Sequence, residues 1–256
     1  MAPSEDAAQL ERIATWLRDA RSIVVLTGAG ISTESGVPDF RGPQGVWTKD
    51  PQAEKTATLQ HYLGDREVRV RSWRTRMDGG WWLKEPNAGH LALAELETRA
   101  ALDMLVTQNV DGLHQKAGSS PEKMVEIHGT MTAVQCMSCG ERGPMEATLE
   151  RVRAGEDDPP CLACGGVLKS ATISFGQSLV PEDLERSFEA AAGCDVFLAL
   201  GTSLGVYPAA DLPGIAMRAG AVLVIGTAQE TPYDRYADAV RQDQLGTWLP
   251  AAVALI

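Results

Sequence analysis

The stretch VVLTGAGISTESGVPDFRG, residues 24–42, decides the fold class. Its first residues belong to an apolar, β-branched run from Ser22 to Leu26 (SIVVL), which is typical of a strand covered on both faces. Gly28 and Gly30 follow at once, where the lack of a side chain lets the backbone turn sharply and lets a phosphate approach backbone N–H groups. The stretch therefore predicts a buried strand that ends in a ligand-binding loop.

Strand-like and helix-like segments alternate along the rest of the chain. Apolar runs of the same kind recur at 103–107 (DMLVT), 195–200 (DVFLAL) and 221–225 (AVLVI). Helical patterns lie between them, beginning at His90 and at Pro181. Because strands that alternate with helices form parallel sheets covered on both faces, we expect an α/β fold with a doubly wound, Rossmann-like parallel sheet.

Two stretches do not follow this alternation. Residues 46–86 are rich in Trp, Arg and Tyr and predict a helical insertion, whereas residues 131–170 carry four cysteines among glycines, prolines and charges. We therefore expect one domain over residues 1–256 whose sheet-forming part is interrupted twice. The sheet-forming segments are 1–45, 87–130 and 171–256, with the helical insertion at 46–86 and a small zinc-binding subdomain at 131–170.

The charge balance and the cysteine count exclude several classes of protein. With 23 basic and 34 acidic residues, the formal net charge is −11, which argues against a surface built mainly for nucleic acid or for a membrane. No apolar run approaches the ~20 residues that span a bilayer, and the first residues (MAPSEDAAQLERI) lack the pattern of a secretory signal. Five cysteines are too few for a disulfide scaffold, so we expect a cytoplasmic protein.

The glycine loop departs from the fingerprint of a standard dehydrogenase. That fingerprint needs a third glycine, where this chain has Thr33, and an acidic residue at the end of a second strand about 20 positions on. Asp50 has roughly that spacing but follows no strand-like run. The loop instead continues into Pro38-Asp39-Phe40-Arg41, which brings an acid, an aromatic ring and a cation to one place. These residues line a ligand site or form an internal Asp–Arg pair.

Polar side chains follow the strand at 103–107. Gln108, Asn109 and Asp111 come directly after it, and ligands of open α/β sheets bind at the carboxyl ends of the strands. A bound ligand or a solvated polar turn would satisfy these side chains. His128 follows another short apolar run, and histidine exchanges protons near neutral pH, which makes it a candidate general base.

Four cysteines form two matched pairs. Cys136-x-x-Cys139 and Cys161-x-x-Cys164 are separated by 21 residues, and two such knuckles together supply the four thiolates of a tetrahedral zinc site. With four cysteine ligands no position remains for water, so the zinc is expected to be structural. A redox role needs only one pair and is the weaker interpretation. Cys194, the fifth cysteine, is expected to be a buried apolar residue.

The motifs together resemble those of the sirtuin family of NAD-dependent protein-lysine deacylases, of the bacterial type. They are GAGISTESGVPDFRG, TQNVDGLH, IHGT, the paired CxxC knuckles and GTSLGVYP, in the family's order and spread from about residue 20 to 250. The resemblance implies a site for NAD, with His128 and Asn109 as the catalytic residues. It implies cofactor contacts from Gly28, Ala29, Gly30, Ser32, Asp39, Phe40, Arg41, Trp47, Gln108, Asn109, Asp111, Gly201, Thr202, Ser203 and Gly226.

The resemblance also implies a substrate and a reaction. The acyl-lysine peptide is expected to lie as an added strand along residues 167–180, with contacts from Ile173, Phe175 and Gly176. NAD is cleaved at its nicotinamide bond, and His128 acts as general base for a ribose hydroxyl, so that the products are nicotinamide, lysine and O-acyl-ADP-ribose. The partners are therefore acylated proteins or peptides.

This chain departs from the family pattern at several positions. Ser170 and Gln177 replace residues common in the peptide-binding stretch, and Gly226 stands where many relatives have an asparagine. Relatives that prefer succinyl or malonyl lysine carry a Tyr-x-x-Arg pair. The nearest equivalents here are Trp73 with Arg76, or Tyr62 with Arg66, and neither pair matches cleanly. We therefore expect acetyl to be the preferred group.

Two other functions use parts of the same pattern. A protein mono-ADP-ribosyltransferase would use the same NAD pocket, but it would not need a base such as His128 to complete deacylation, and a deacylase for succinyl or long-chain groups would differ only in pocket shape. A non-enzymatic module that binds nucleic acid through the zinc ribbon is disfavoured, because the segment around the knuckles is rich in Glu and Asp.

Overall fold

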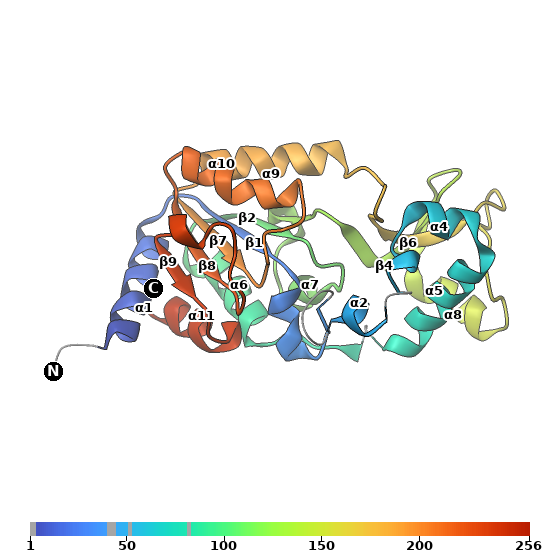
Figure 1. The fold of residues 1–256 in the computed structure, drawn as a ribbon, viewed down its shortest axis with the longest axis horizontal. Coiled ribbons are helices and arrows are strands. Elements are labelled where there is room, and N and C mark those ends of the chain that lie inside the picture. The colour runs from blue at the N-terminus through green and yellow to red at the C-terminus, as the bar shows by residue number, and fades with distance from the viewer. Residues whose placement is uncertain (1–3, 40–44, 51–52, 81–82) are drawn as a thin grey trace.

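The computed structural model describes residues 4–39, 45–50, 53–80 and 83–256. The molecule has a large lobe built on a sheet and a smaller lobe at its far end, and the C-terminus lies on the large lobe (Figure 1). Two residues predicted to bind the cofactor, Phe40 and Arg41, lie outside the described residues, as does the side chain of Trp47. Within the described ranges, no helix has both the length and the apolar content needed to cross a membrane.

The large lobe contains a six-stranded sheet in the order β3-β2-β1-β7-β8-β9. Every neighbouring pair in this sheet is parallel, which confirms the predicted doubly wound arrangement. β1, β7 and the end of β8 are fully buried, as expected for β-branched runs covered on both faces. The strands are β1 (Ile23–Thr27), β2 (Leu102–Thr107), β3 (Met124–Glu126), β7 (Val196–Leu200), β8 (Val222–Gly226) and β9 (Ala239–Arg241).

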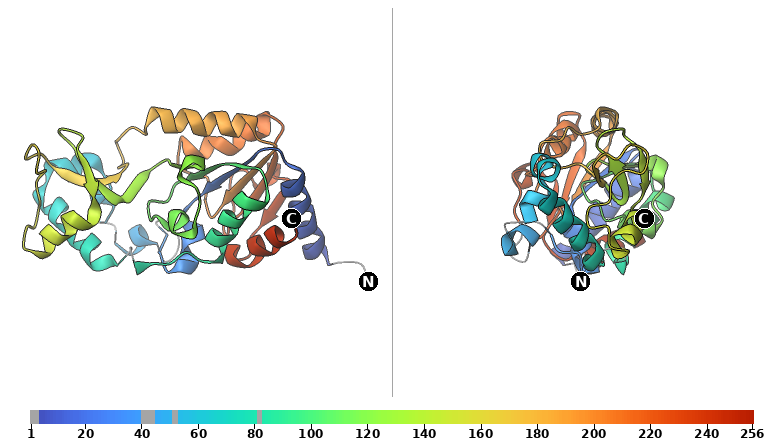
Figure 2. Two further views of the ribbon diagram at one scale, coloured as in Figure 1. Left: turned by 180° about the vertical axis from the view of Figure 1, so that it is seen from behind. Right: turned by 90° about the vertical axis from the view of Figure 1, so that its right-hand side faces the viewer.

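Helices cover both faces of this sheet (Figures 1 and 2). One face packs against α1 (Glu5–Asp19), α6 (Ala88–Arg99) and α11 (Leu245–Ala254). The other packs against α9 (Pro181–Gly193) and α10 (Leu212–Arg218). Shorter helical segments of this lobe are η1 (Ala29–Ser35), α7 (Leu113–Ala117), η3 (Pro121–Lys123), η4 (Ala209–Asp211) and η5 (Asp234–Tyr236).

The small lobe contains a three-stranded antiparallel sheet in the order β5-β4-β6, with helices on it. Trp73, fully buried, packs in one core with Val134, Leu149 and Leu168, so the helical insertion and the cysteine-rich segment bury their apolar side chains against each other. The elements are α2 (Val46–Lys49), α3 (Ala53–Thr56), α4 (Leu59–Gly64), α5 (Arg66–Gly79), β4 (Gly129–Cys136), β5 (Arg142–Pro144), α8 (Met145–Arg153) and β6 (Leu168–Thr172).

Two glycine loops meet at the carboxyl ends of β1 and β7. Gly28 N donates to Leu200 O at 3.0 Å, Gly30 N to Gly201 O at 2.8 Å, and Gly201 N to Gly226 O at 2.7 Å. A Cβ at Gly30 would lie 2.8 Å from the Cα of Gly201, and a Cβ at Gly201 would lie 2.3 Å from Ile31 N. The loops therefore approach so closely that side chains cannot be accommodated between them.

The Gly201→Ala substitution should destabilise the fold. Gly201 has φ +61°, a left-handed conformation that costs an alanine about 1–2 kcal/mol, and its Cβ would also overlap the backbone of the facing loop. We expect the free energy of unfolding in urea to fall by at least ~2 kcal/mol.

Gly205→Ala in the same loop is the matched control, because its φ is not left-handed and its Cβ would meet only the Ser203 hydroxyl at 3.7 Å. Equal unfolding free energies for the two variants would contradict the proposed loop contact.

Candidate active site at the carboxyl edge of the sheet

The carboxyl ends of neighbouring strands bring the predicted polar residues together. In a parallel sheet all strands end at the same edge, so Gly28 after β1, Gln108 after β2 and Gly201 after β7 become neighbours. Gln108 Nε2 donates to Thr202 Oγ1 at 2.9 Å, which links the end of β2 to the end of β7 past β1, the strand between them. The polar residues that follow β1, β2 and β7 thus lie along one edge of the sheet.

Asn109 is fixed in place by the loop after β1. Its Nδ2 donates to Gly28 O at 3.0 Å and to Ser32 Oγ at 3.1 Å. Ser32 Oγ in turn donates to Asp111 Oδ2 at 2.7 Å, and the other carboxylate oxygen accepts from Leu113 N at 3.0 Å. Asn109 and Ser32 are buried and Asp111 is half-buried, so the set presents a carboxylate and an amide of fixed orientation beside the glycine loop.

The glycine loop uses most of its N–H groups internally. Gly28 and Gly30 donate to the facing loop, whereas Ala29 N makes none of the described loop contacts and Ala29 is half-buried. Ser203 is exposed, and Asp39, half-buried, is already engaged in an interaction. Ala29 N and the Ser203 hydroxyl are therefore two groups in the described part of this edge that remain available to a phosphate or ribose.

The side chains of Trp248 and Leu200 leave no room for a side chain at Gly226. A Cβ at this position would lie 2.5 Å from Trp248 Cζ2 and 3.0 Å from Leu200 Cδ2. An asparagine cannot replace Gly226 unless Trp248 moves, so at this position only the backbone remains to contact a ligand.

His128 stands where the large and small lobes join. Its Nδ1 lies 3.1 Å from Gln108 O, and because a carbonyl only accepts, Nδ1 carries the proton and donates. Nε2 is then the unprotonated nitrogen, and no group in the described chain hydrogen-bonds to it. Burial lowers the pKa of His128, while the bond to Gln108 O partly opposes this. His128 is thus neutral near pH 7 and presents a free basic nitrogen.

The predicted peptide stretch lies directly beside His128. Ile173 N donates to His128 O at 2.7 Å, and Gly129 pairs with Thr172 at the start of β4. Phe175, 42% exposed, uses its N–H and carbonyl on the segment before α4, with Phe175 N to Ala57 O at 2.8 Å and Leu59 N to Phe175 O at 3.0 Å. Gly176 follows in an exposed position with φ +83°.

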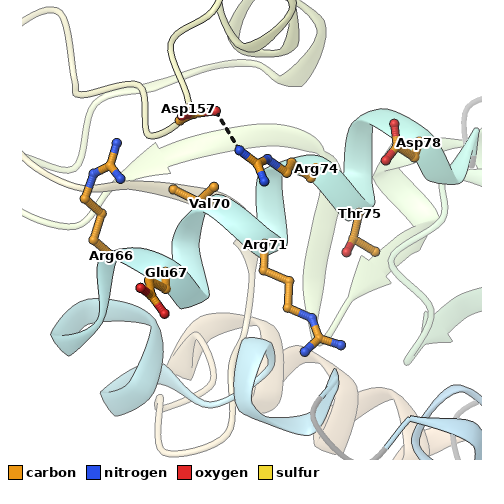
Figure 3. Close-up of a pocket in the computed structure, with 8 residues that line it drawn as sticks. All are labelled: Arg66, Glu67, Val70, Arg71, Arg74, Thr75, Asp78 and Asp157. Atoms are coloured by element: carbon orange, nitrogen blue, oxygen red, sulfur yellow. Dashed lines mark hydrogen bonds and ion pairs between the residues drawn. The ribbon is translucent and has the colours of Figure 1, made fainter.

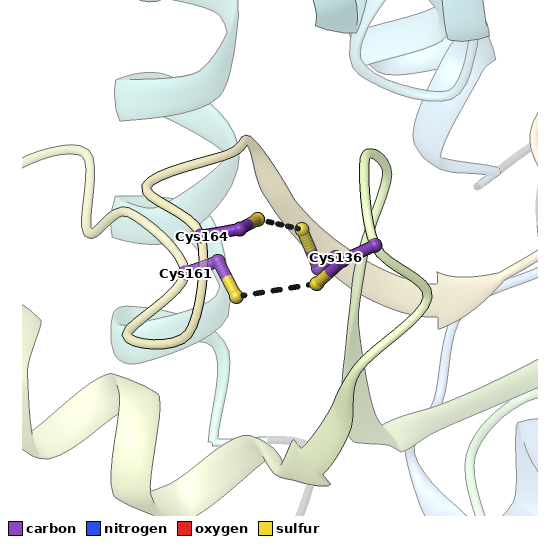
Figure 4. A group of neighbouring side chains, drawn as sticks. Cys136, Cys161 and Cys164 are labelled. Atoms are coloured by element: carbon purple, nitrogen blue, oxygen red, sulfur yellow. Dashed lines mark hydrogen bonds between the residues drawn. The ribbon is translucent and has the colours of Figure 1, made fainter.

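The four predicted metal ligands meet at the tip of the small lobe. All four Sγ atoms lie within 4.8 Å of one another, with Cys136 and Cys164 at 3.5 Å and Cys139 and Cys161 at 3.8 Å (Figure 4). Zinc–sulfur bonds of ~2.3 Å in a tetrahedron place sulfurs about 3.8 Å apart, so the thiolates fit a structural zinc ion. Cys194 lies elsewhere, buried, and burial raises the pKa of its thiol to about 12.

Replacing one zinc ligand should remove the metal and loosen the small lobe. For Cys139→Ser we expect zinc content, measured by plasma mass spectrometry, to fall from about one ion per chain to near zero, together with a lower melting temperature. Cys194→Ser is the control and should retain its zinc, because Cys194 lies outside the cluster. Zinc retained at full stoichiometry by Cys139→Ser would contradict the four-thiolate site.

The arginine-rich helix α5 binds the cysteine-rich segment through ion pairs. Arg69 Nη2 lies 2.9 Å from Asp158 Oδ2, and Arg74 Nη2 lies 3.1 Å from Asp157 Oδ1. An open groove of about 460 Å³ runs along this helix, with the Arg74–Asp157 pair on its wall (Figure 3). None of the predicted site residues lines this groove.

Three buried residues of the edge were not predicted from the sequence. Thr27, His90 and His114 are each at most 1% exposed. His114 hydrogen-bonds to Thr27, and His90 lies within hydrogen-bond distance of Ser32, the partner of Asn109. A single histidine or threonine carries no local pattern that separates such a position from ordinary packing. For His90 the sequence offered one clue: it stands three residues after Asn87, the spacing of a capping box at the start of a helix.

Comparison with known proteins identifies the class of this fold and site. The Sir2 family model matches residues 28–208, and the chain belongs to the Sir2 family, the sirtuins. The NAD-dependent protein deacetylase 2 of Streptomyces coelicolor is 52% identical over 90% of this chain and 95% of its own length. The NAD-dependent protein deacetylase 1 of Bradyrhizobium diazoefficiens is 38% identical over 94% of this chain and 93% of its own.

Solved structures agree with this assignment. A Sir2 enzyme superposes with a TM-score of 0.85 at 37% identity, covering 97% of each chain. A substituted Sir2 protein with a deacetylated p53 peptide and 3'-O-acetyl ADP-ribose superposes with a TM-score of 0.86 at 32% identity, over 94% of this chain and 96% of that one.

Proposed function

We infer that this chain is an NAD-dependent protein-lysine deacylase. The observation that carries the inference is the position of His128, whose side chain is held by Gln108 of the predicted NAD edge and whose backbone binds Ile173 of the predicted peptide stretch. His128 thereby lies between the predicted NAD edge and the predicted peptide stretch. Membership of the Sir2 family and the deacetylase activity of its relatives support this function.

The chain's own groups suggest the division of roles. NAD, the co-substrate, supplies an electrophilic sugar carbon and a nicotinamide leaving group. The glycine loop and Ser203 bind its phosphates and adenosine ribose, while Asn109 and Asp111 orient the nicotinamide half. His128 Nε2 accepts a ribose hydroxyl proton, and its Nδ1–H stays bound to Gln108 O, which keeps the ring oriented.

The preferred acyl group is proposed to be acetyl. Trp73 is buried in the small-lobe core, and Arg76 donates to Ser72 O at 3.2 Å and to Ser170 Oγ at 2.7 Å. The buried Tyr62 donates its hydroxyl to Leu168 O at 2.9 Å. Since Arg76 and Tyr62 have these internal partners, an acyl carboxylate that binds to either of them would have to displace those bonds. An uncharged short acyl group has no such cost.

The partners and compartment follow from the same features. The substrates are proposed to be proteins or peptides with acylated lysines, bound along residues 167–180 with contacts from Ile173, Phe175 and Gly176. Nucleic acid and membranes are not proposed as partners, given the net charge of −11. A cytoplasmic location is proposed because none of the five cysteines forms a disulfide, as expected in a reducing compartment.

Deacylation of synthetic peptides tests the function. A lysine peptide carrying acetyl, succinyl or myristoyl is incubated with the protein, with and without NAD, and followed by mass spectrometry. Acetyl should be lost fastest and only with NAD. His128→Ala should lower the rate at least ~100-fold, because it removes the general base.

His61→Ala is the matched control, since His61 is exposed on α4 and should leave the rate unchanged. If NAD is consumed and the protein gains ADP-ribose mass while every peptide keeps its acyl group, the mono-ADP-ribosyltransferase is the correct function. If succinyl or myristoyl is removed faster than acetyl, the acyl preference is wrong.

The pH dependence of the reaction tests the general base. Burial lowers the pKa of His128 below its ordinary value of about 6.5, and the base is active only when deprotonated. The apparent kcat/KM should therefore fall toward low pH with a midpoint below pH 6.5. Steady-state rates between pH ~5 and ~8 measure this acidic part of the pH profile. A midpoint above pH 6.5 would show that another group titrates.

A further inference from the structure

Two chains of side-chain hydrogen bonds converge on Asn109. Its side chain is held by Gly28 O and Ser32 Oγ at 3.0 and 3.1 Å, and its backbone N–H donates to Thr107 Oγ1 at 3.1 Å. Asn109 is only 7% exposed. Both its backbone and its amide group therefore depend on the orientation of neighbouring hydroxyl groups.

The hydrogen bond of the Asn109 backbone N–H depends, through Thr107, on Thr27 and His114. Thr27 Oγ1 donates its only proton to Thr107 Oγ1 at 2.8 Å, so it must accept from His114 Nε2 at 2.9 Å. This requires the tautomer of His114 that carries its proton on Nε2. His114 Nδ1 is then an unprotonated nitrogen that is buried and has no partner in the described chain.

The hydrogen bond of the Asn109 side chain to Ser32 depends on His90. Asn87 N lies 3.4 Å from His90 Nδ1 and donates to it, so His90 carries its proton on Nε2, which lies 3.4 Å from Ser32 Oγ. Ser32 Oγ then accepts from His90 and Asn109 and has its own proton free for Asp111, to which it donates at 2.7 Å. Every donor and acceptor in this branch is assigned without conflict.

The two histidines lie side by side in the core. Their ring centroids are 4.9 Å apart, and the side chains are 0% and 1% exposed. Burial lowers the pKa of His90 to about 4 and that of His114 to about 3, so both rings are neutral at pH 7. Neutral rings with one tautomer each hold the hydroxyl groups of Ser32 and Thr27 in one direction.

We propose that His114, acting through Thr27 and Thr107, is a positioning residue that fixes the backbone of Asn109 for NAD cleavage. His90 has the corresponding role for the Asn109 side chain through Ser32. The inference rests on the proposed function, in which Asn109 orients the nicotinamide half of NAD. Neither histidine touches the reactants, and the effect of each passes entirely through Asn109.

A double-mutant cycle between Thr27 and Asn109 tests this route. Thr27→Val keeps the shape of the side chain but removes the hydroxyl, whereas Thr27→Ser keeps the hydroxyl. We expect Thr27→Val to lower kcat for nicotinamide release by about 10- to 100-fold, with the KM for the acyl-lysine peptide unchanged, and Thr27→Ser to stay within about twofold. In the Asn109→Ala background, Thr27→Val should change kcat by less than about twofold.

A pair of substitutions at His114 provides an independent measurement. His114→Gln places an amide N–H where Nε2 was and should keep most of kcat, whereas His114→Asn is too short to reach Thr27 and should lose it to the same extent as Thr27→Val. Melting temperatures show which variants are folded. If Thr27→Val does not fold, the Gln and Asn variants still decide the question.

The outcomes separate this inference from the proposed function. If the unmodified protein releases no nicotinamide from NAD, the proposed function fails. If it is active and Thr27→Val lowers kcat equally with and without Asn109, the hydroxyl acts on general stability and the positioning role is wrong. Equal activity of His114→Gln and His114→Asn would also overturn it.

Discussion

Direct backbone contact between two loops is the constraint on which the rest of the site depends. Gly30 and Gly201 approach until the position of a Cβ on one falls 2.8 Å or less from the backbone of the other. The hydrogen bonds that close this contact continue the sheet pairing beyond the strands, from β1 to β7 and from β7 to β8. The carboxyl edge is thereby shaped before any ligand binds, which reduces the ordering that binding requires.

The edge remains polar and buried because its groups satisfy one another. Asn109, Ser32 and Asp111 form a set in which each donor finds an acceptor, and an unpaired buried group would cost about 1–3 kcal/mol. The neutral His90 and His114 extend the set into the core without placing a charge there. His128 lies outside this set: its Nδ1–H donates to Gln108 O, which leaves Nε2 as an unprotonated, basic nitrogen.

The sequence predicted those features that depend on a continuous run of residues or on a regular spacing between them. The β-branched runs predicted four of the six sheet strands, β1, β2, β7 and β8, and the paired CxxC spacing predicted the cluster of four thiols. The common core of the two insertions was not predicted, because Trp73 and Leu149 meet only in three dimensions. The need for glycine at position 226 was not predicted for the same reason, since it is the distant Trp248, on α11, that excludes a side chain there.

The zinc site and the candidate base lie at opposite ends of one strand pair. Cys136 ends β4 and pairs with Leu168 at the start of β6, whereas Gly129 begins β4 and pairs with Thr172 at the end of β6. Gly129 directly follows His128, and Ile173 directly follows Thr172 and binds His128 O at 2.7 Å. The β4–β6 pairing, which shifts register between Gly129 and Val134, therefore connects the cysteine cluster to the residues where the candidate base and the predicted peptide stretch meet. A metal held by four thiolates has no open coordination position, so its contribution is to hold the Cys136 end of β4 and the knuckle beside β6 together rather than to take part in the chemistry.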